Sequence, residues 1–353
     1  MPLPLYQGLH APQRPDSANM NMGLWFERYF DGYAADFAEV SQEQRTQWLR
    51  QLATKQLGSS STLERKVETM QALAQAQGGQ VRQYHCAGNF VTGMGNPHPL
   101  ENGFTWHPTL GMPYLPGSTV KGLVRAAIEN GYQGEDKAAV LKRWFGTETK
   151  GDVAEASGCF IFFDALPTAP YELLPEVMTP HMGKWYEKGG KDPMGKDTQP
   201  GDWHSPVPVG YLVARNLKLQ FAIAPRAGAL AGQDMASELD NVWQALDYAL
   251  QWLGAGGKTA LGYGRMLSEH QKQALHEAAA ERVDGVRLKY NRANGALTAE
   301  TREKKPYVAL KDKADTLLQT LPTALQQKIK TNQCFDKFTA YVDGTDLLRL
   351  EQA

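Results

Sequence analysis

The sequence contains few cysteines, and their spacing excludes two classes of small stabilised domain. Three are present among 353 residues, Cys86, Cys159 and Cys334, and no two of them form a CxxC pair. A disulfide framework or a zinc knuckle needs closely spaced cysteines, so neither is expected. Isolated cysteines fit the reducing cytoplasm, and we predict a cytoplasmic location.

The sequence also lacks an excess of charge of one sign. It has 37 Lys and Arg against 38 Asp and Glu, which gives a formal net charge of -1. This balance excludes a wholly basic nucleic-acid-binding protein, so any such site has to be a local patch.

Long apolar runs are absent as well. No stretch reaches the roughly 20 apolar residues that a membrane-spanning helix needs, and the N-terminal MPLPLYQ lacks the charged and then apolar pattern of a signal peptide. The hydrophobic share of 42% is still enough for a sizeable core. We expect a soluble protein with no membrane partner.

A stiff segment that leads into a helix lies at residues 111–125 (GMPYLPGSTVKGLVR). Its two prolines fix φ and keep the residues before them extended. Gly117 then permits a sharp turn, and Ser118 or Thr119 can cap the helix that follows. The sequence predicts backbone N–H groups that open onto a helix N-terminus.

Two basic residues, Lys121 and Arg125, lie four positions apart on one face of that helix. A helix N-terminus flanked by basic side chains is suited to an anion such as phosphate. The alternative is a structural turn with two solvated basic residues, and on this segment alone that alternative is slightly favoured.

A glycine-rich loop lies at residues 254–265 (GAGGKTALGYGR). Its Gly-Lys-Thr resembles the end of a phosphate-binding P-loop, but the first glycine of that motif falls on Trp252, and the loop follows a helix and precedes a strand. ATP binding is therefore not expected. The remaining interpretation is a run of backbone donors with Lys258 and Arg265, which can lie against a sugar–phosphate backbone.

The hydrophobic pattern predicts the order of the elements. An extended arm (1–20) and a helical region (21–79) precede the core. The core is expected as a strand at 81–90, a helix at 118–130, strands at 158–164 and 211–223, a helix at 236–253 and a strand at 263–267. This βαββαβ order is that of the α+β ferredoxin-like fold, which is also the fold of RNA-recognition domains.

Residues 167–206 form a long segment rich in proline, aromatic residues and lysines, which we interpret as an inserted loop. Aromatic rings beside lysines suit stacking on unpaired bases while the charges follow the phosphates. A surface loop whose rings fold back onto the core is an equally weighted alternative.

Taken together, these motifs resemble the RAMP superfamily of CRISPR effector subunits. The segments at 111–125 and 254–265 carry the resemblance, and shorter matches at 21–26 (NMGLWF), 92–99 (TGMGNPHP), 162–165 (FFDA) and 178–181 (MTPH) narrow it to the subunit-six family of type III-B (Cmr) complexes. Such proteins bind the 3′ part of CRISPR RNA and cap a filament of related subunits without cutting RNA.

The resemblance implies a ferredoxin-like (RRM-like) RAMP core at 80–267 with a thumb-like insertion at 167–206, an N-terminal arm and helices at 1–79, and a C-terminal extension at 268–353. The implied partners are CRISPR RNA, its target RNA, and the backbone, capping and small subunits of the complex. No cofactor or metal is implied. The implied RNA-binding residues are Gly117, Ser118, Thr119, Lys121, Arg125, His181, Lys184, Trp203, Gly254, Gly256, Gly257, Lys258, Thr259, Gly262, Tyr263, Gly264 and Arg265.

Few residues suit catalysis, so we expect no enzymatic activity. Glu101 is the sole carboxylate between residues 88 and 128, and one carboxylate without neighbours is a poor Mg²⁺ site. The competing hypothesis is an endoribonuclease that processes CRISPR RNA, with His98, His107 or His181 as general base. No spacing of nucleophile, base and orienting residue supports it.

The C-terminal region has its own basic residues. A helix at 270–283, a hairpin of 286–290 with 296–299 around Asn294-Gly295, and an amphipathic helix at 311–330 are expected. This last helix either packs on the core or docks a neighbouring subunit. We predict that the region contributes to assembly of the complex.

Overall fold

The computed structural model describes two compact units, Met1–Ser268 and Glu269–Ala353. The described residues are 21–34, 37, 39–57, 61–131, 136–147, 157–188, 191, 195, 198–201, 203–228, 235–332 and 337–352. The arm predicted at 1–20 and Cys334 lie outside them. No helix in the described part of the chain is both long and apolar enough to cross a membrane.

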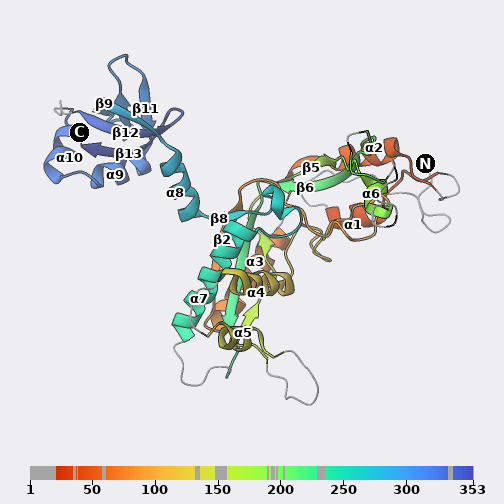
Figure 1. Ribbon diagram of the computed structural model, residues 1–353. Helices are drawn as coiled ribbons and strands as arrows, with labels where there is room; N and C mark the ends of the chain where they lie inside the picture. The colour runs from red at the N-terminus through yellow and green to blue at the C-terminus, as the bar shows by residue number, and fades with distance from the viewer. Residues whose placement is uncertain are drawn as a thin grey trace. The chain divides into compact units, whose positions relative to one another are not determined.

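An antiparallel sheet forms the centre of the first unit (Figure 1). Its strand order is β3-β7-β2-β8, and a short strand β4 also pairs with β7. The strands are β2 (Gln80–Cys86), β3 (Phe160–Phe162), β4 (Leu166–Pro167), β7 (Lys218–Pro225) and β8 (Met266–Ser268). The unit is therefore a mixed α+β structure. Strands overlap the predicted 81–90, 158–164 and 263–267, whereas the single strand predicted at 211–223 is divided between β6 (Val209–Arg215), which belongs to another sheet, and β7.

Helices cover both faces of this sheet. Tyr84 donates to Asp247 of α7 at 2.6 Å, whereas Gln220 donates to the Val67 carbonyl of α3 at 3.3 Å, so α7 and α3 lie on opposite faces. The helix α4 packs beside α7. The helices are α3 (Ser61–Ala76), α4 (Gly117–Gly131), α5 (Lys137–Phe145) and α7 (Met235–Tyr248), which continues as the π-helical turn η2 (Ala249–Leu253).

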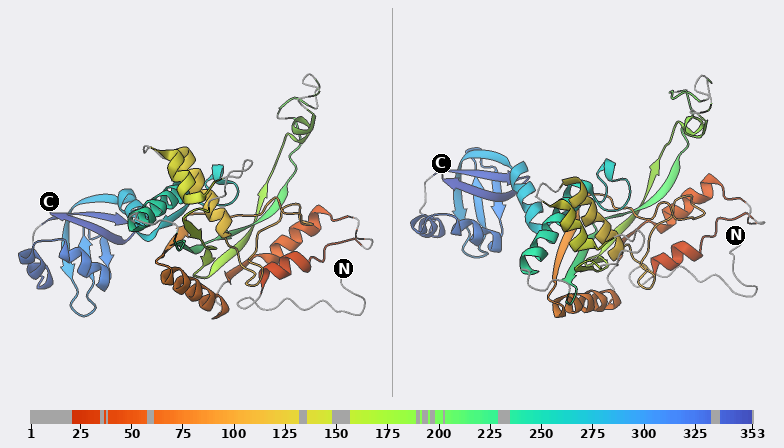
Figure 2. Two further views of the ribbon diagram at one scale, coloured as in Figure 1. Left: turned by 90° about the horizontal axis from the view of Figure 1, so that it is seen from below. Right: turned by 60° about the horizontal axis from the view of Figure 1, so that its bottom comes forward.

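A second sheet, with order β1-β5-β6, lies beside the N-terminal helices. Its strands are β1 (Thr54–Leu57), β5 (Tyr171–Met178) and β6 (Val209–Arg215), and the nearby helices are α1 (Met22–Arg28), α2 (Gln42–Leu52) and α6 (Gly183–Lys188). Figure 2 shows β5 and β6 as a ribbon that projects from the unit and carries α6 at its tip. We call this element the β5–β6 ribbon.

The β5–β6 ribbon corrects the prediction of a loop over the whole of 167–206. Seven residues of β5 pair with β6, from Glu172 to Met178, so the first part of the segment is strand. The predicted helical region at 21–79 is also interrupted by β1, which pairs with β5. Two leucines of this region, Leu24 and Leu73, are 51% and 47% exposed.

The second unit is a closed five-stranded barrel with the order β10-β11-β13-β12-β9. Its elements are α8 (Glu269–Ala279), β9 (Glu281–Tyr290), β10 (Leu297–Glu300), β11 (Pro306–Ala309), α9 (Lys311–Gln319), α10 (Thr323–Lys330), β12 (Phe338–Asp343) and β13 (Asp346–Gln352). The predicted hairpin is confirmed as β9–β10. The prediction of a single helix at 311–330 is wrong, because the helix is interrupted at Leu321-Pro322 and forms α9 and α10. Both helices pack on the barrel's own core.

Candidate nucleic-acid interface

The glycine-rich loop at 254–265 is packed so closely that several positions admit no side chain. A Cβ on Gly256 would lie 2.2 Å from the Val91 carbonyl oxygen, and one on Gly264 would lie 1.8 Å from that of Ala255. Both glycines have positive φ, 89° and 67°. The glycines therefore give this loop one defined shape.

The loop is held against the segment that follows β2. The Gly257 N–H donates to the Val91 carbonyl at 2.7 Å, and the Gly264 N–H donates to the Asn89 carbonyl at 2.8 Å. These bonds join residues more than 160 positions apart in the sequence. The loop is consequently a rigid edge of the central sheet, at the end where β2 stops and β8 begins.

Lys258 lies half-buried where this loop meets the β5–β6 ribbon. Its Nζ atom lies 3.3 Å from the Met178 sulfur and 4.9 Å from the centre of the Tyr211 ring. A thioether is a weak acceptor, and no carboxylate in the described part of the chain pairs with Lys258. The ammonium group thus keeps donors for an external anion.

Arg265 ends the same loop and is half-buried. Its backbone carbonyl accepts from Ala87 at 2.8 Å, which fixes the start of β8. Its Nε atom is buried with no hydrogen-bond partner among the described residues. A buried guanidinium N–H without a partner is costly, and because Nε is closed to solvent, any contact with an external phosphate has to come from the rest of the guanidinium group.

A polar network that the sequence did not indicate supports the loop. Asn89 donates to Glu176 and to the Tyr263 hydroxyl, both at 3.2 Å, and accepts from Arg215 at 3.0 Å. The Tyr263 and Tyr211 hydroxyls are 3.2 Å apart. Burial, followed by the bond to Tyr263, raises the pKa of Tyr211 above its usual range, so the Tyr211 phenol stays neutral.

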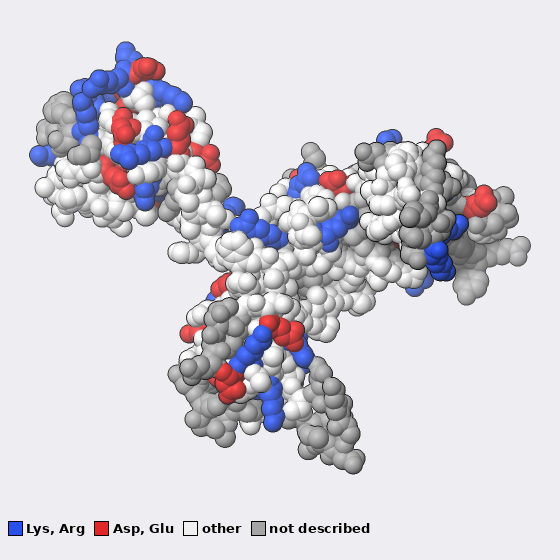
Figure 3. All heavy atoms as spheres, in the orientation of Figure 1, with Lys and Arg blue, Asp and Glu red and all other residues white. Residues whose placement is uncertain are grey.

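Exposed apolar side chains flank the loop. Trp252, two positions before Gly254, is 66% exposed, and Leu261, within the loop, is 70% exposed. Figure 3 shows basic groups near β6 and β8 on an otherwise largely uncharged surface. An exposed indole beside basic groups is the composition of a stacking site, and the exposure of Trp252 could not be read from the sequence alone.

The segment at 111–125 is engaged by partners within the unit, which argues against an anion site at its helix N-terminus. The Gly117 N–H at the start of α4 donates to the Asp164 carboxylate at 2.7 Å, so an acidic side chain already occupies the helix N-terminus. Ser118 and Thr119 lie exposed in the first turn and do not cap the helix.

The two basic residues of this segment have protein partners. Lys121 donates to the Phe145 carbonyl at the end of α5, at 3.0 Å. Arg125 pairs with Glu129 at 2.8 Å. Lys121 and Arg125 thus contact residues of α4 and α5. The glycine-rich loop instead contacts Asn89–Met94 and the β5–β6 ribbon.

The residues predicted within the insertion lie toward the outer end of the β5–β6 ribbon. His181, Lys184 and Trp203 are all exposed, and Trp203 stacks at a tilt on His204. Tyr186 of α6 is 74% exposed. The structure thus gathers aromatic and basic side chains beyond Met178, the end of β5 that Lys258 contacts.

The histidines proposed as general bases have structural environments. His98 stacks on Phe26 at 4.0 Å and bonds to the Phe26 carbonyl at 2.9 Å, and burial lowers its pKa. Burial likewise lowers the pKa of His107, whose Nδ1 lies 3.4 Å from the Thr109 N–H. Glu101 is paired with Arg45, which leaves it poorly placed to bind a metal.

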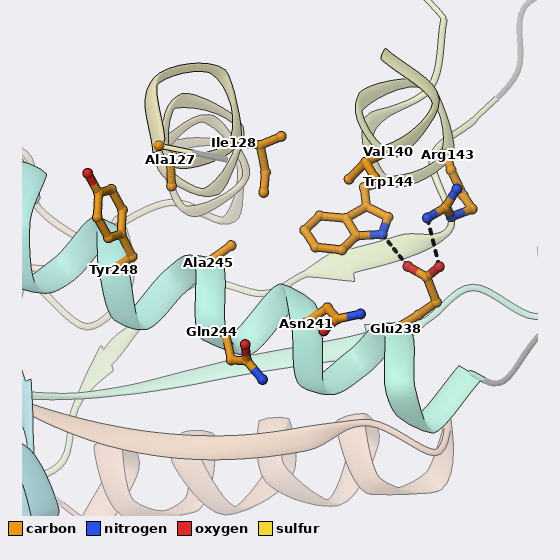
Figure 4. A pocket seen from close by; sticks show the side chains of 11 residues that line it. Ala127, Ile128, Val140, Arg143, Trp144, Glu238, Asn241, Gln244, Ala245 and Tyr248 are labelled. Carbon is orange, nitrogen blue, oxygen red and sulfur yellow. Dashed lines mark hydrogen bonds and ion pairs between the residues drawn. The ribbon is translucent and has the colours of Figure 1, made fainter. Parts of the chain in front are cut away.

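The structure also contains a hollow of about 290 Å³ between α4, α5 and α7 (Figure 4). Glu238 is its charged acceptor, and it is engaged by Arg143 at 2.7 Å and by the Trp144 indole at 2.5 Å. The other lining is largely apolar, including Ile128 and Ala245. This arrangement provides packing between helices and presents no nucleophile beside a base.

Comparison with known families identifies the class of this fold. A model of the RAMP superfamily matches residues 84–267, just over half of the chain, from the end of β2 to β8. The chain therefore belongs to the RAMP superfamily.

Within that superfamily the chain is similar to the Cmr6 subunits of CRISPR systems. It is 25% identical to Cmr6 of Pyrococcus furiosus over 232 residues, which cover 50% of this chain and 64% of that protein. It is 34% identical to Cmr6 of Saccharolobus solfataricus over 96 residues, 27% of this chain and 30% of the relative. The matches thus span less than two thirds of either relative.

Solved structures show a more distant likeness. A chain of the type III-B Cmr-beta complex bound to cognate target RNA is 16% identical, with a TM-score of 0.48, over 65% of this chain and 74% of that one. The crystal structure of Cmr6 from Pyrococcus furiosus is 22% identical, with a TM-score of 0.30, over 54% of this chain and 97% of that one.

Proposed function

We propose that the chain is a non-catalytic, RNA-binding subunit of a type III-B CRISPR effector, which holds the 3′ part of the CRISPR RNA and caps the filament of backbone subunits. Membership of the RAMP superfamily and similarity to two Cmr6 proteins support the class. The observation that carries the proposal is the rigid loop at 254–265, in which Lys258 and Arg265 have donors without anionic partners.

The strand order supports a ferredoxin-like core within this proposal. Numbered along the core, the strands β2, β3, β7 and β8 lie in the order 4-1-3-2, with α4 and α7 as the connecting helices. In this arrangement the glycine-rich loop precedes β8, the last strand. It lies at the same end of the sheet as the loop that follows β2, the first strand. The β5–β6 ribbon would then be the thumb-like element that follows the guide–target duplex.

An RNA-processing endonuclease receives less support. His98 is stacked and bonded inside the unit, and the lowered pKa of His98 and His107 follows from burial. His181 is exposed at the outer end of the β5–β6 ribbon. We propose that RNA cleavage by the complex belongs to other subunits.

The proposal predicts that incorporation of this chain depends on one end of the guide. When backbone RAMP subunits are reconstituted with guide RNA, the chain should enter the particle with full-length guide and be lost when the 3′ part is removed. A guide shortened equally at the 5′ end is the control and should retain the chain. Native mass spectrometry reads out the composition, and equal incorporation with both shortened guides would contradict the proposal.

An assay of the purified chain, without the other subunits, tests the enzymatic alternative. Purified chain incubated with 5′-labelled repeat RNA should leave the RNA intact. Cleavage that disappears in one of the variants His98→Ala, His107→Ala or His181→Ala would establish a nuclease and overturn the non-catalytic assignment.

A further inference from the structure

The second unit has a strand arrangement that recurs in oligonucleotide-binding barrels. Counted in sequence order, β9 to β13 are the first to the fifth strand. Around the barrel they lie in the order β9, β10, β11, β13 and β12, and β12 pairs with β9 to close it. The third and fifth, β11 and β13, pair in parallel, and α9 and α10 lie between the third and fourth strands. This is the order of the OB-fold, whose ligands are oligonucleotides and oligosaccharides.

A fold alone does not give a function, so the side chains on the binding face must decide it. OB-folds bind on their second and third strands and on the loop between the first and second. Here that loop is 291–296, and beside it lies a hollow of about 890 Å³ on β9 and β10, the first and second strands, so it shares the second strand and this loop with the usual binding face. Its lining includes Arg287, Lys289, Tyr290, Arg292, Thr298 and Glu300.

The hollow carries more basic than acidic groups. Arg287 makes no ion pair among the described residues, and Arg292 uses its Nε to bond the Lys330 carbonyl at 3.0 Å, which leaves its terminal amines available. Lys289 pairs with Glu300, the one carboxylate in the described lining. Figure 3 shows Lys and Arg side chains gathered over the β9 end of this unit. A basic lining favours a polyanion over a neutral sugar chain.

The floor of the hollow is fixed before any ligand arrives. Asn332, at φ 58°, accepts from the Tyr290 N–H at 2.8 Å and donates to the Tyr290 carbonyl at 3.0 Å. These two bonds tie the end of β9 to the chain that leaves α10. Tyr290 is half-buried and packs against the barrel core, so these bonds hold the strand whose exposed positions are Arg287 and Lys289.

We infer that the second unit binds single-stranded RNA across the outer face of β9 and β10, with Arg287, Lys289 and Arg292 as phosphate contacts. The choice of RNA over DNA rests on the function proposed above, whereas the site itself does not use the loop at 254–265. This unit also lies outside residues 84–267, the part that the superfamily model matches. The chain would therefore hold RNA at two separate sites.

The test measures binding of the full-length protein to a labelled single-stranded RNA of about 12 nucleotides, within the usual site size of an OB-fold. The double variant Arg287→Ala/Lys289→Ala should lose about tenfold or more in affinity, and its salt slope should fall by about 1.4, or 0.7 per phosphate contact. The control Lys313→Ala/Arg349→Ala removes the same charge from exposed positions outside the hollow. It should leave both quantities unchanged.

A single substitution in the opposite direction sharpens the test. Glu300→Gln removes the negative charge that engages Lys289, so RNA should bind several-fold more tightly. A residue with a merely structural role would not raise affinity when changed. DNA of the same sequence, run in parallel, should bind more weakly than RNA.

The outcomes separate this inference from the proposed function. If Arg287→Ala/Lys289→Ala binds RNA as the control does, with circular dichroism showing a folded protein, the second site is refuted even when Lys258→Ala weakens binding. If Arg287→Ala/Lys289→Ala weakens RNA binding and Lys258→Ala does not, the second site is supported and the assignment of the glycine-rich loop fails. Loss of co-purification with neighbouring subunits, without any change in RNA binding, would mark the hollow as a protein-docking surface and overturn the inference.

Discussion

Replacing Lys258 and Arg265 together by alanine is expected to weaken guide-RNA binding about a hundredfold, since a hydrogen bond to a charged group contributes about 1.5–3 kcal/mol and 1.4 kcal/mol is tenfold. Lys258 lacks a carboxylate partner in the described part of the chain, and the Arg265 Nε is buried without an acceptor there. Neither side chain therefore has to break an ion pair among the described residues before it contacts a phosphate.

The salt dependence distinguishes lost phosphate contacts from general damage. The slope of log affinity against log salt should fall by about 1.4 in the double variant, or 0.7 per contact on a single strand. The variant Arg65→Ala/Lys66→Ala removes the same charge from exposed positions on α3, which covers the opposite face of the sheet from α7. Fluorescence anisotropy at several salt concentrations checks this, and equal slopes for both double variants would refute the contacts.

A single methyl group on Gly264 is expected to disorganise the loop and reduce RNA affinity by at least tenfold. Its Cβ would lie 1.8 Å from the Ala255 carbonyl oxygen, far inside van der Waals contact, so the backbone has to move. That movement breaks the bond from the Gly264 N–H to Asn89, at 2.8 Å. Strain and crowding together should cost about 2–5 kcal/mol.

Gly262→Ala is the matched control for this substitution. Gly262 has a similar φ of 82°, but no atom lies within 4 Å of the position that its Cβ would take. It bears the left-handed strain of about 1–2 kcal/mol without the clash. Hydrogen exchange of peptides that contain 254–265 should rise strongly for Gly264→Ala and little for Gly262→Ala. Similar exchange in the two variants would show that close packing does not fix the loop.

Local sequence patterns were sufficient for the core of the first unit. The helix at 236–253 and the strand at 217–223 have regular apolar periods, and both elements are present as α7 with η2 and as β7. The strand β5 was missed because Pro175 lies within it. That proline is tolerated because β1 pairs with β5 only from Tyr171 to Leu173, so position 175 has a partner on one side alone.

The barrel of the second unit depends on contacts that no local pattern reveals. Closure requires β12 to pair with β9, more than 50 positions earlier, and β11 to pair in parallel with β13. A turn at Gly344, with φ 58°, between two apolar stretches was the available signal for the hairpin β12–β13. Because β9 starts at Glu281 and the unit itself at Glu269, a truncation intended to remove this unit should begin at Glu269.

The same limit applies to the candidate site. The glycine-rich loop was predicted because its composition is local, and its shape follows from its own glycines. The carboxylate that occupies the N-terminus of α4 comes from Asp164, 47 positions away, so the sequence suggested an anion site where the protein supplies its own acid. Asn89 and Glu176, which support the loop, are joined only by the fold.

The most direct measurement of the central claim is photo-crosslinking in the assembled particle. Guide RNA with 4-thiouridine placed in its 3′ part would be incorporated, irradiated and digested, and the modified peptides of this chain identified by mass spectrometry. We expect crosslinks within residues 252–265, around Trp252, Lys258 and Arg265. Efficient crosslinks elsewhere on the chain with none in this loop would contradict it.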